Sequence, residues 1–455
     1  MLIKAFFSDD IAHISYLLIG KSGIFAIDPQ RDISVYEEEI KKRDLPLKGI
    51  LLTHPHADFI SGHREMQEKY KAPVYAHKKA PYQTGFHAVE EGDELNLDHI
   101  KIQVLDTPGH TPFCNSFLVT DFSRGNKPVA VFTGDTLFVG DAGRPDLFPE
   151  QKVELAGKLY DSLFDKLLKL DDFVEVYPAH ASGSLCGKSL SEKRATTIGY
   201  EKLFNPRLQH TKKEAFIQEI LADDLPVPEH FKYCAGKNLK GPALLENIPD
   251  AKAIPTEEFA KKMSTGNYTL IDIRNFNQWN QYHLPGSISI DINCLAFANY
   301  AGWIIPQEKE ILLVHSSEED IEKAVVSLRK IGIDQPVYYA ENGMEGMLYH
   351  GMEIQQTTTY LPSELPKLNF KKEKTILLDV RQNKEEGKYP LAYIHQPASS
   401  ILSERFLPEK NKEYIVICEK GALASLVISF LQNKGFDNIS YLLGSGKTLR
   451  KVTVL

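Results

Sequence analysis

A short apolar segment that runs directly into metal-binding residue types constrains the fold of this chain more than any other feature. Residues 49–53 (Gly-Ile-Leu-Leu-Thr) have the composition of a buried β-strand, and His54, His56 and Asp58 follow at once. Imidazole and carboxylate groups bind divalent first-row metals, and ligands at a strand end are held more firmly than ligands on a free loop. The segment therefore predicts a metal site carried by a rigid β-strand.

Three later segments have the same build. Each is a predicted apolar strand followed by a potential ligand: 102–106 leads to His110, 129–132 to Asp135, and 173–176 to His180. A single loop histidine is more often solvated or hydrogen-bonded than bound to metal, but four such strand ends in one chain favour a shared site. We therefore expect these four segments to meet at one metal centre.

The motifs at these strand ends resemble those of the metallo-β-lactamase superfamily. The runs are Thr-His-Pro-His-Ala-Asp at 53–58, Thr-Pro-Gly-His at 107–110 and Gly-Asp-Thr at 134–136, and the resemblance covers about the first 235 residues. It implies an α/β fold in which two sheets pack between helical layers (an αββα sandwich), in a domain at 1–240. The chain departs from the pattern at Phe59, where the family has a second histidine. Because an aromatic ring does not coordinate metal, we expect the second metal position of dinuclear members to be lost or badly weakened.

The branch of the superfamily that works with one metal is the persulfide dioxygenases, and the resemblance implies their ligand set. It assigns one Fe(II) per chain to His54, His110 and Asp135, and Zn would bind the same ligands as a substitute. Two imidazoles and one carboxylate leave coordination positions open, which suits non-haem Fe(II) and oxygen chemistry. The implied partners are a small-molecule persulfide and O2.

The other polar residues of these loops are candidates for supporting roles in catalysis. His56, Asp58 and His180 can orient ligands and bound water through hydrogen bonds, or they can be plain structural residues of the loops. Gly-Ser-Leu-Cys-Gly at 183–187 resembles a stretch of dioxygenases that are fused to rhodanese domains. The resemblance implies that Cys186 accepts or relays sulfane sulfur, although a buried free cysteine is more often an inert apolar residue.

Arg144 and Tyr177 are the residues that we expect to bind substrate near the metal. Gly-Arg-Pro-Asp at 143–146 is similar to the Gly-Arg-x-Asp stretch of persulfide dioxygenases, in which the arginine faces the anionic end of the substrate. A guanidinium group can bind a carboxylate through two parallel hydrogen bonds. The alternative for Arg144 is a structural ion pair with Asp141 or Asp146.

The second half of the chain contains an internal repeat of about 105 residues. Apolar strands alternate with helical stretches from residue 269 and again from residue 375, which predicts a central parallel sheet in each copy. Both copies resemble rhodanese domains through an Asp-x-Arg strand end, at 272–274 and 379–381. We expect two rhodanese-like α/β domains, at 251–355 and 366–455.

The two copies differ at the position of the rhodanese nucleophile, which is Cys418 in the second copy and His315 in the first. The resemblance implies that the first copy is structural and that Cys418 carries sulfur. Backbone N–H groups and the dipole of the following helix should lower its pKa. Leu423 stands where active rhodaneses often have Arg or Thr, which leaves Lys420 as the nearby cation for substrate binding. Because the loss of the arginine weakens anion binding, a persulfide is favoured over thiosulfate as the sulfur donor. The alternative is an inactive copy with a buried thiol.

Composition adds several expectations. The formal net charge of −8 argues against nucleic-acid binding, and no stretch approaches a membrane span. The five cysteines are odd in number and form no Cys-x-x-Cys pair, which favours reduced thiols. The N-terminal residues have neither signal-peptide nor transit-peptide character, so we expect a cytoplasmic protein. We also expect a homo-oligomer.

Together these features predict an enzyme that oxidises low-molecular-weight thiol persulfides to sulfite. Sulfite and a second sulfane sulfur, held on Cys186 or Cys418, would then join as thiosulfate. Three alternatives remain. A glyoxalase II-like zinc thioester hydrolase would use two metals, and Phe59 counts against it. A pure sulfur carrier would need only Cys418. A non-enzymatic sulfide sensor is the third alternative, although the sequence contains no recognisable DNA-binding element.

Overall fold

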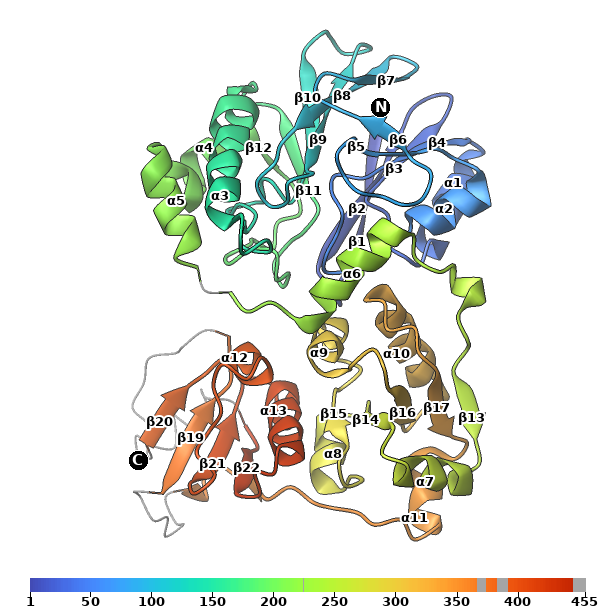
Figure 1. The fold of residues 1–455 in the computed structure, drawn as a ribbon, viewed down its shortest axis with the longest axis vertical. Helices are drawn as coiled ribbons and strands as arrows, with labels where there is room; N and C mark the ends of the chain where they lie inside the picture. Colours follow the sequence, from blue (N-terminus) through green and yellow to red (C-terminus); the bar gives the residue numbers. More distant parts are fainter. Residues whose placement is uncertain (224, 366–373, 383–391, 445–455) are drawn as a thin grey trace. The chain divides into compact units, whose positions relative to one another are not determined.

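The computed structural model describes residues 1–223, 225–365, 374–382 and 392–444, and the chain forms two units (Figure 1). The first unit is Met1–Asn247 with Arg329–Gly332, and the second is Ile248–Leu328 with Ile333–Leu455. The three domain boundaries proposed from the sequence stay a prediction.

Two six-stranded sheets form the centre of the first unit. One has the order β1-β2-β3-β4-β5-β6: β1 (Leu2–Ser8), β2 (His13–Ile19), β3 (Ile24–Ile27), β4 (Leu47–Leu51), β5 (Val74–His77) and β6 (His87–Val89). The other has the order β12-β11-β10-β9-β8-β7: β7 (Glu94–Leu97), β8 (Ile100–Asp106), β9 (Asn115–Asp121), β10 (Pro128–Gly134), β11 (Glu175–Pro178) and β12 (Thr196–Thr197).

Strand alternation explains why these sheets are covered on both faces. In β2, Tyr16 and Leu18 belong to the core between the two sheets, whereas Leu17 and Ile19 pack with residues of two helices on the outer face. These helices are α1 (Ser34–Arg43) and α2 (His63–Tyr70). The second sheet is covered in the same way by α3 (Lys152–Asp161), α4 (Ile198–Phe204) and α5 (Lys213–Leu221). The predicted αββα sandwich is confirmed; α6 (Glu229–Lys240) follows it in the chain.

The second unit contains two parallel five-stranded sheets with matching strand orders, β13-β17-β16-β14-β15 and β18-β22-β21-β19-β20. The first copy is β13 (Lys252–Ile254), α7 (Thr256–Ser264), β14 (Tyr268–Asp272), α8 (Phe276–Gln281), β15 (Ile288–Ser289), α9 (Phe297–Ile304), β16 (Glu310–Val314), α10 (Glu318–Lys330), β17 (Val337–Ala340) and α11 (Gly343–Tyr349). The second is β18 (Thr359–Tyr360), β19 (Thr375–Asp379), β20 (Ala392–His395), α12 (Ala398–Leu402), β21 (Glu413–Ile417), α13 (Ala422–Asn433) and β22 (Ile439–Leu442). The predicted repeat and its parallel sheets are confirmed within these ranges.

The strands that carry the predicted ligands are shifted by about two residues from their expected bounds. β4 ends at Leu51, so Thr53 already lies in the loop, and β11 begins at Glu175 and ends at Pro178. Short helical turns complete the chain: η1 (Ser162–Lys166), η2 (Leu167–Lys169), η3 (Pro206–Gln209) and η4 (Leu245–Asn247). Among the helices in the described ranges, none has the length and apolar character needed to span a bilayer.

Candidate functional site

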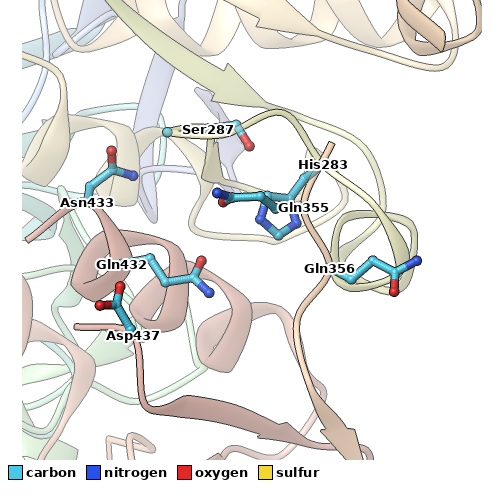
Figure 2. Close-up of a pocket in the computed structure, with 8 residues that line it drawn as sticks. His283, Ser287, Gln355, Gln356, Gln432, Asn433 and Asp437 are labelled. Atoms are coloured by element: carbon cyan, nitrogen blue, oxygen red, sulfur yellow. The ribbon is translucent and has the colours of Figure 1, made fainter. Parts of the chain in front are cut away.

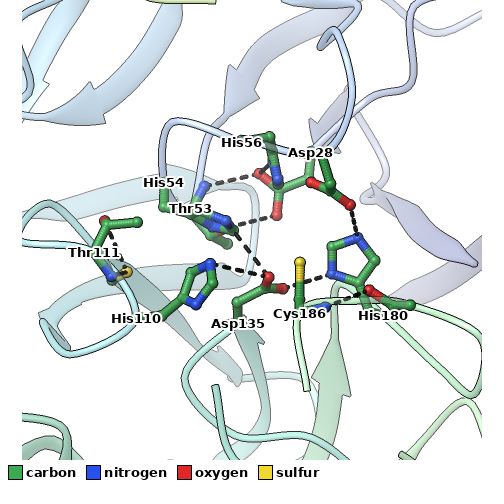
Figure 3. A network of polar contacts seen from close by, with 12 residues as sticks. Asp28, Thr53, His54, His56, His110, Thr111, Asp135, His180 and Cys186 are labelled. Atoms are coloured by element: carbon green, nitrogen blue, oxygen red, sulfur yellow. Dashed lines mark hydrogen bonds and ion pairs between the residues drawn. The ribbon is translucent and has the colours of Figure 1, made fainter. Parts of the chain in front are cut away.

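Three of the predicted ligands meet beyond the ends of β4, β8 and β10 (Figure 3). The Nε2 atoms of His54 and His110 lie 3.7 and 3.4 Å from Oδ2 of Asp135. Their ligand atoms all lie within 4.8 Å of one another, and the three side chains are at most 2% exposed. The structure thus brings together the residues that sequence reasoning selected.

Hydrogen bonds on the far side of each imidazole fix which nitrogen carries the proton. Thr53 Oγ1 donates to Asp28 Oδ2 at 2.7 Å, so at 3.0 Å from His54 Nδ1 it accepts the Nδ1–H of that ring. His110 Nδ1 donates to the backbone carbonyl of Arg144 at 2.9 Å. Both rings therefore turn an unprotonated Nε2 toward Asp135, the arrangement that metal-binding histidines adopt.

The electrostatics of this group fit a cation. Burial lowers the pKa of His54 to about 3 and also lowers the pKa of His110, so both rings are neutral. Burial alone would raise the pKa of Asp135, but His180, His54 and His110 hold it well below its usual value. Among the described residues, His54 Nε2 and Asp135 Oδ2 have no hydrogen-bond partner. A bound metal ion would stabilise this arrangement, in which the Nε2 lone pairs of two imidazoles and a carboxylate face one another in a buried space.

His180 lies between two carboxylates. Its Nδ1 is 2.8 Å from Asp135 Oδ1 and its Nε2 is 2.8 Å from Asp58 Oδ2. Burial lowers the pKa of His180, but the two carboxylates outweigh burial and raise it well above 6.5. The ring is therefore protonated, with Nδ1 donating to Asp135 and Nε2 forming an ion pair with Asp58. His180 occupies one oxygen of Asp135 and leaves the other facing His54 and His110.

Phe59 and His56 lie beside the ligand group rather than in it. Phe59 is fully buried, with its ring centre 4.1 Å from that of His13 and 4.4 Å from that of His56. His56 Nε2 lies 3.0 Å from Asp28 Oδ1, and the ring is therefore directed at Asp28. A supporting role for His56 stays a prediction.

A second group of potential ligands adjoins the first and was not expected. Asp58, His180 and Cys186 place one ligand atom each within 4.8 Å of one another, and all three are buried. These three residues could hold a metal ion, and the expected loss of the second metal position at Phe59 stays a prediction. Burial, followed by the charges of Asp58 and Asp135, raises the pKa of Cys186 well above 9, which keeps the sulfur protonated in this structure.

Arg144 is not placed to bind substrate, which corrects the sequence-based assignment. Its guanidinium pairs with Asp146 through Nε at 2.6 Å and Nη2 at 2.7 Å. The remaining N–H groups donate to the carbonyls of Leu185, Pro226 and Leu225. All five donors are thus in use and the residue is 3% exposed. The ion-pair alternative holds, and through its own carbonyl Arg144 positions His110.

Tyr177 has partners of its own in the structure, and its assignment to substrate binding stays a prediction. Its hydroxyl donates to Glu175 at 2.7 Å, and its ring packs against Tyr16 and Phe132 at the edge of the core between the sheets. Residues two apart in β11 point to the same face, which places Glu175 beside Tyr177.

Asp28 and Thr53 are site residues that sequence reasoning missed. Asp28 accepts from the Thr53 backbone N–H at 2.8 Å and from its hydroxyl, and so anchors the first residue of the ligand loop. The signal was present: the buried strand β3 ends at Ile27 and Asp28 follows, which is the same strand-then-acid pattern used for Asp135.

Cys418 lies in a cradle of backbone N–H groups between β21 and α13. The Gly421 N–H donates to its Sγ at 2.9 Å, and those of Lys420, Leu423 and Ala424 also point at the sulfur. Burial nevertheless outweighs these donors and raises the pKa of Cys418, so the expected lowering is wrong. In the first copy, His315 Nε2 donates to the Ala340 carbonyl at 3.0 Å, a structural bond.

The second unit also contains a polar cavity of about 370 Å³ (Figure 2). His283 and Ser287 of the first copy line it together with Gln432, Asn433 and Asp437 of the second. None of the catalytic, substrate or metal residues selected from the sequence is among its lining residues, so it does not enter the site described above.

Known proteins are similar to this chain in sequence and in fold. Residues 15–180 match the family description "Metallo-beta-lactamase superfamily", and residues 255–349 match "Rhodanese-like domain". A crystal structure titled as a metallo-beta-lactamase from Staphylococcus aureus subsp. aureus COL is 30% identical, covers 74% of this chain and 98% of its own, and superposes with a TM-score of 0.67. The chain belongs to the metallo-β-lactamase superfamily.

Other superfamily relatives cover mainly the first unit. A hydroxyacylglutathione hydrolase of Francisella tularensis subsp. novicida is 34% identical over 182 residues, which is 40% of this chain and 68% of that protein. A crystal structure of ETHE1 from Myxococcus xanthus is 30% identical over 52% of this chain and 98% of its own, with a TM-score of 0.46. Domains of the superfamily and rhodanese-like domains are typically enzymatic, and the superfamily fold implies a metal, iron or zinc.

Proposed function

We propose that this protein is a non-haem Fe(II) dioxygenase that oxidises low-molecular-weight thiol persulfides to sulfite, coupled to sulfur transfer at Cys418. The proposal rests on one observation. His54, His110 and Asp135 present two unprotonated nitrogens and one carboxylate oxygen to a common point. Two histidines and one carboxylate are the ligand set of non-haem Fe(II) oxygenases. One ferrous ion per chain, held there, would supply the place where sulfur and O2 react.

The residues around the ligand group prepare it for this chemistry. Thr53 and the Arg144 carbonyl hold the two imidazoles in one tautomer, and His180 keeps one oxygen of Asp135 occupied. All of these groups are buried, and their hydrogen bonds hold the ligand side chains in position before substrate arrives.

The overall reaction balances without a further cofactor. One persulfide (RSSH), one O2 and one water give one thiol (RSH) and one sulfite with its two protons. The outer sulfur loses four electrons, and O2 accepts them. The thiol leaves when the S–S bond breaks.

Sulfite can then take a second sulfur from Cys418. Sulfite attacks the outer sulfur of a Cys418 persulfide, a new S–S bond forms, and Cys418 leaves as a thiolate that the N–H cradle stabilises. The product is thiosulfate. Residues 255–349, in the copy that precedes Cys418, match a rhodanese-like domain, and the copy with Cys418 has the same strand order, which supports a sulfur-transfer role for it.

Anaerobic purification with metal analysis, followed by oxygen-electrode traces with glutathione, cysteine and coenzyme A persulfides, tests the proposal. We expect one iron per chain and uptake of one O2 per sulfite formed. Asp135→Asn should lose both iron and uptake, whereas Asp98→Asn, in an exposed turn, should keep both. An iron-loaded protein that takes up no O2 with any of the three persulfides would refute the dioxygenase.

A metal-dependent thioester hydrolase is the second candidate. The group Asp58, His180 and Cys186 favours it, since it adjoins the first group and could hold a second metal; a hydroxyacylglutathione hydrolase is also among the relatives. In that case the purified protein would contain two metal ions per chain, hydrolyse a glutathione thioester, and lose the second metal in Cys186→Ala.

A further inference from the structure

The helix that follows Cys418 packs against the first rhodanese-like copy. Asn280 Nδ2 in α8 donates to Ser425 Oγ in α13 at 2.9 Å, and the Ser289 backbone N–H in β15 donates to Ser429 Oγ at 3.0 Å. The chain that leaves β15 reaches Cys294 five residues later. These bonds bring the segment with Cys294 to the loop with Cys418.

Contacts around Asp291 bring the two thiols to one region: a Cβ on Gly421 would lie 2.2 Å from the Phe276 ring, the Phe276 N–H donates to Asp291 Oδ2 at 3.1 Å, and the Asp291 carbonyl accepts from the Cys294 N–H at 2.9 Å. Burial raises the pKa of the Cys294 thiol, the Cys418 sulfur raises it further, and the Lys420 ammonium lowers it. The hydroxyl of Tyr300 in α9 lies near both: burial raises its pKa, and the two cysteines add to the effect. Cys294, Cys418 and Lys420 thus form one group, called the two-thiol cluster below.

The members of the two-thiol cluster differ in access to solvent. Cys418 is 3% exposed, and Gly421 beside it has no room for a side chain, since a Cβ there would lie 2.2 Å from the Phe276 ring. Cys294 is partly exposed, and its neighbour Leu295 is 70% exposed. A bulky thiol persulfide can therefore approach Cys294 more readily than Cys418.

We propose that Cys294 is a second sulfur carrier, which takes the outer sulfur from a thiol persulfide at the surface and passes it to Cys418. The proposal rests on the sulfur transfer at Cys418 proposed above. No sequence motif singles out Cys294. The assignment comes from two thiols of different copies meeting beside one lysine.

Each transfer is an exchange between a persulfide and a thiol, with no net oxidation. The Cys294 thiolate attacks the outer sulfur of RSSH, the S–S bond of the donor breaks, and RSH leaves with the proton of Cys294. The Cys418 thiolate then attacks the outer sulfur on Cys294, which leaves as a thiolate and takes up the proton of Cys418. Lys420 and the Ala296 backbone N–H stabilise the thiolate of Cys294.

Peptide mass spectrometry after rapid alkylation tests the relay on the full-length protein. Coenzyme A persulfide serves as a bulky donor and inorganic HSS⁻ as a small one. With the bulky donor, Cys294→Ser should load Cys418 about tenfold more slowly than the unchanged protein, because the intramolecular route is lost. With HSS⁻ the two rates should agree. Leu295→Ala, which keeps both thiols, is the matched control and should load Cys418 normally.

A second variant checks the relay independently of any folding defect in Cys294→Ser. In Cys418→Ser the sulfur has no onward acceptor, so Cys294 should accumulate one extra sulfur atom. The relay is overturned if Cys294 stays unmodified in this variant, or if a Cys294–Cys418 disulfide forms in the unchanged protein with release of sulfide. Normal loading of Cys418 in Cys294→Ser with both donors would overturn the relay while leaving sulfur transfer at Cys418 intact. Failure to load Cys418 in the unchanged protein would overturn both.

Discussion

Replacing Thr53 by valine tests whether the metal centre depends on the hydrogen bond behind His54. Valine has nearly the shape of threonine, so the close packing of Thr53 against Gly134 is kept. Only the hydroxyl is lost. The backbone N–H of residue 53 still donates to Asp28 Oδ1, so the loop stays anchored.

The loss should weaken metal binding through the tautomer of His54. Without the Thr53 oxygen, the Nδ1–H of His54 is buried without an acceptor, which costs about 1–3 kcal/mol. The ring can avoid this cost by moving the proton to Nε2, which faces Asp135 Oδ2. A metal must then displace that proton. Partners of this kind typically contribute 10- to 100-fold in metal affinity, so we expect a loss of about 1.4–2.7 kcal/mol.

Anaerobic competition titrations with a coloured chelator measure this loss for Fe(II) and for Zn(II). Thr120→Val is the matched control, because Thr120 is also buried, in β9, and the substitution is the same. Its metal affinity should equal that of the unchanged protein. If Thr53→Val also binds both metals with unchanged affinity, the reasoning about the His54 tautomer is refuted.

Three further predictions concern other parts of the chain. Burial, aided by the charge of Arg64, lowers the pKa of His63 from 6.5 to about 3. The neutral ring therefore makes its full contribution to the free energy of unfolding above pH 6.5, and this contribution is lost as the pH falls. His63→Gln should remove about 2 kcal/mol of the difference between the free energies of unfolding measured in urea at pH 7 and at pH 5, and an unchanged difference would contradict this. Arg144→Met leaves Asp146 and three carbonyls without donors and should cost about 2–4 kcal/mol of stability, whereas a stable variant with a raised KM would restore Arg144 as a substrate anchor. Cys418→Ser should shift products from thiosulfate to sulfite while O2 uptake continues, and an unchanged product ratio would reduce Cys418 to a packing residue.

The fold and the first ligand group could be predicted because they depend on local patterns. The alternation of residues between the two faces of β2 and the strand-then-ligand segments are properties of a few consecutive residues. Strands that run in the same direction end at the same edge of a sheet. That rule places His54, His110 and Asp135 near one another, and the resemblance to persulfide dioxygenases selected them from the other histidines and acids of these loops.

The errors have a different origin, because they concern partners that are distant in sequence. Arg144 is saturated by the carbonyls of Leu225 and Pro226, about 80 residues away, which no local motif reveals. Cys186 joins Asp58 through a loop whose path no pattern fixes. The N–H cradle of Cys418 was foreseen, but the burial that reverses its effect comes from packing around the loop.

The Asp-x-Arg motif is present in both copies, although only the second has a cysteine at the position of the rhodanese nucleophile. Arg274 donates to Asp272 at 2.9, 3.1 and 2.7 Å, and Arg381 donates to Asp379 at 2.9, 3.1 and 2.6 Å. The pair has the same geometry in the copy with Cys418 and in the copy without a cysteine nucleophile, so it maintains the strand end and not the chemistry. A contribution of the first copy to sulfur transfer would therefore come from another residue, and the relay proposed above assigns it to Cys294, in a segment that the contacts of α13 bring to the Cys418 loop.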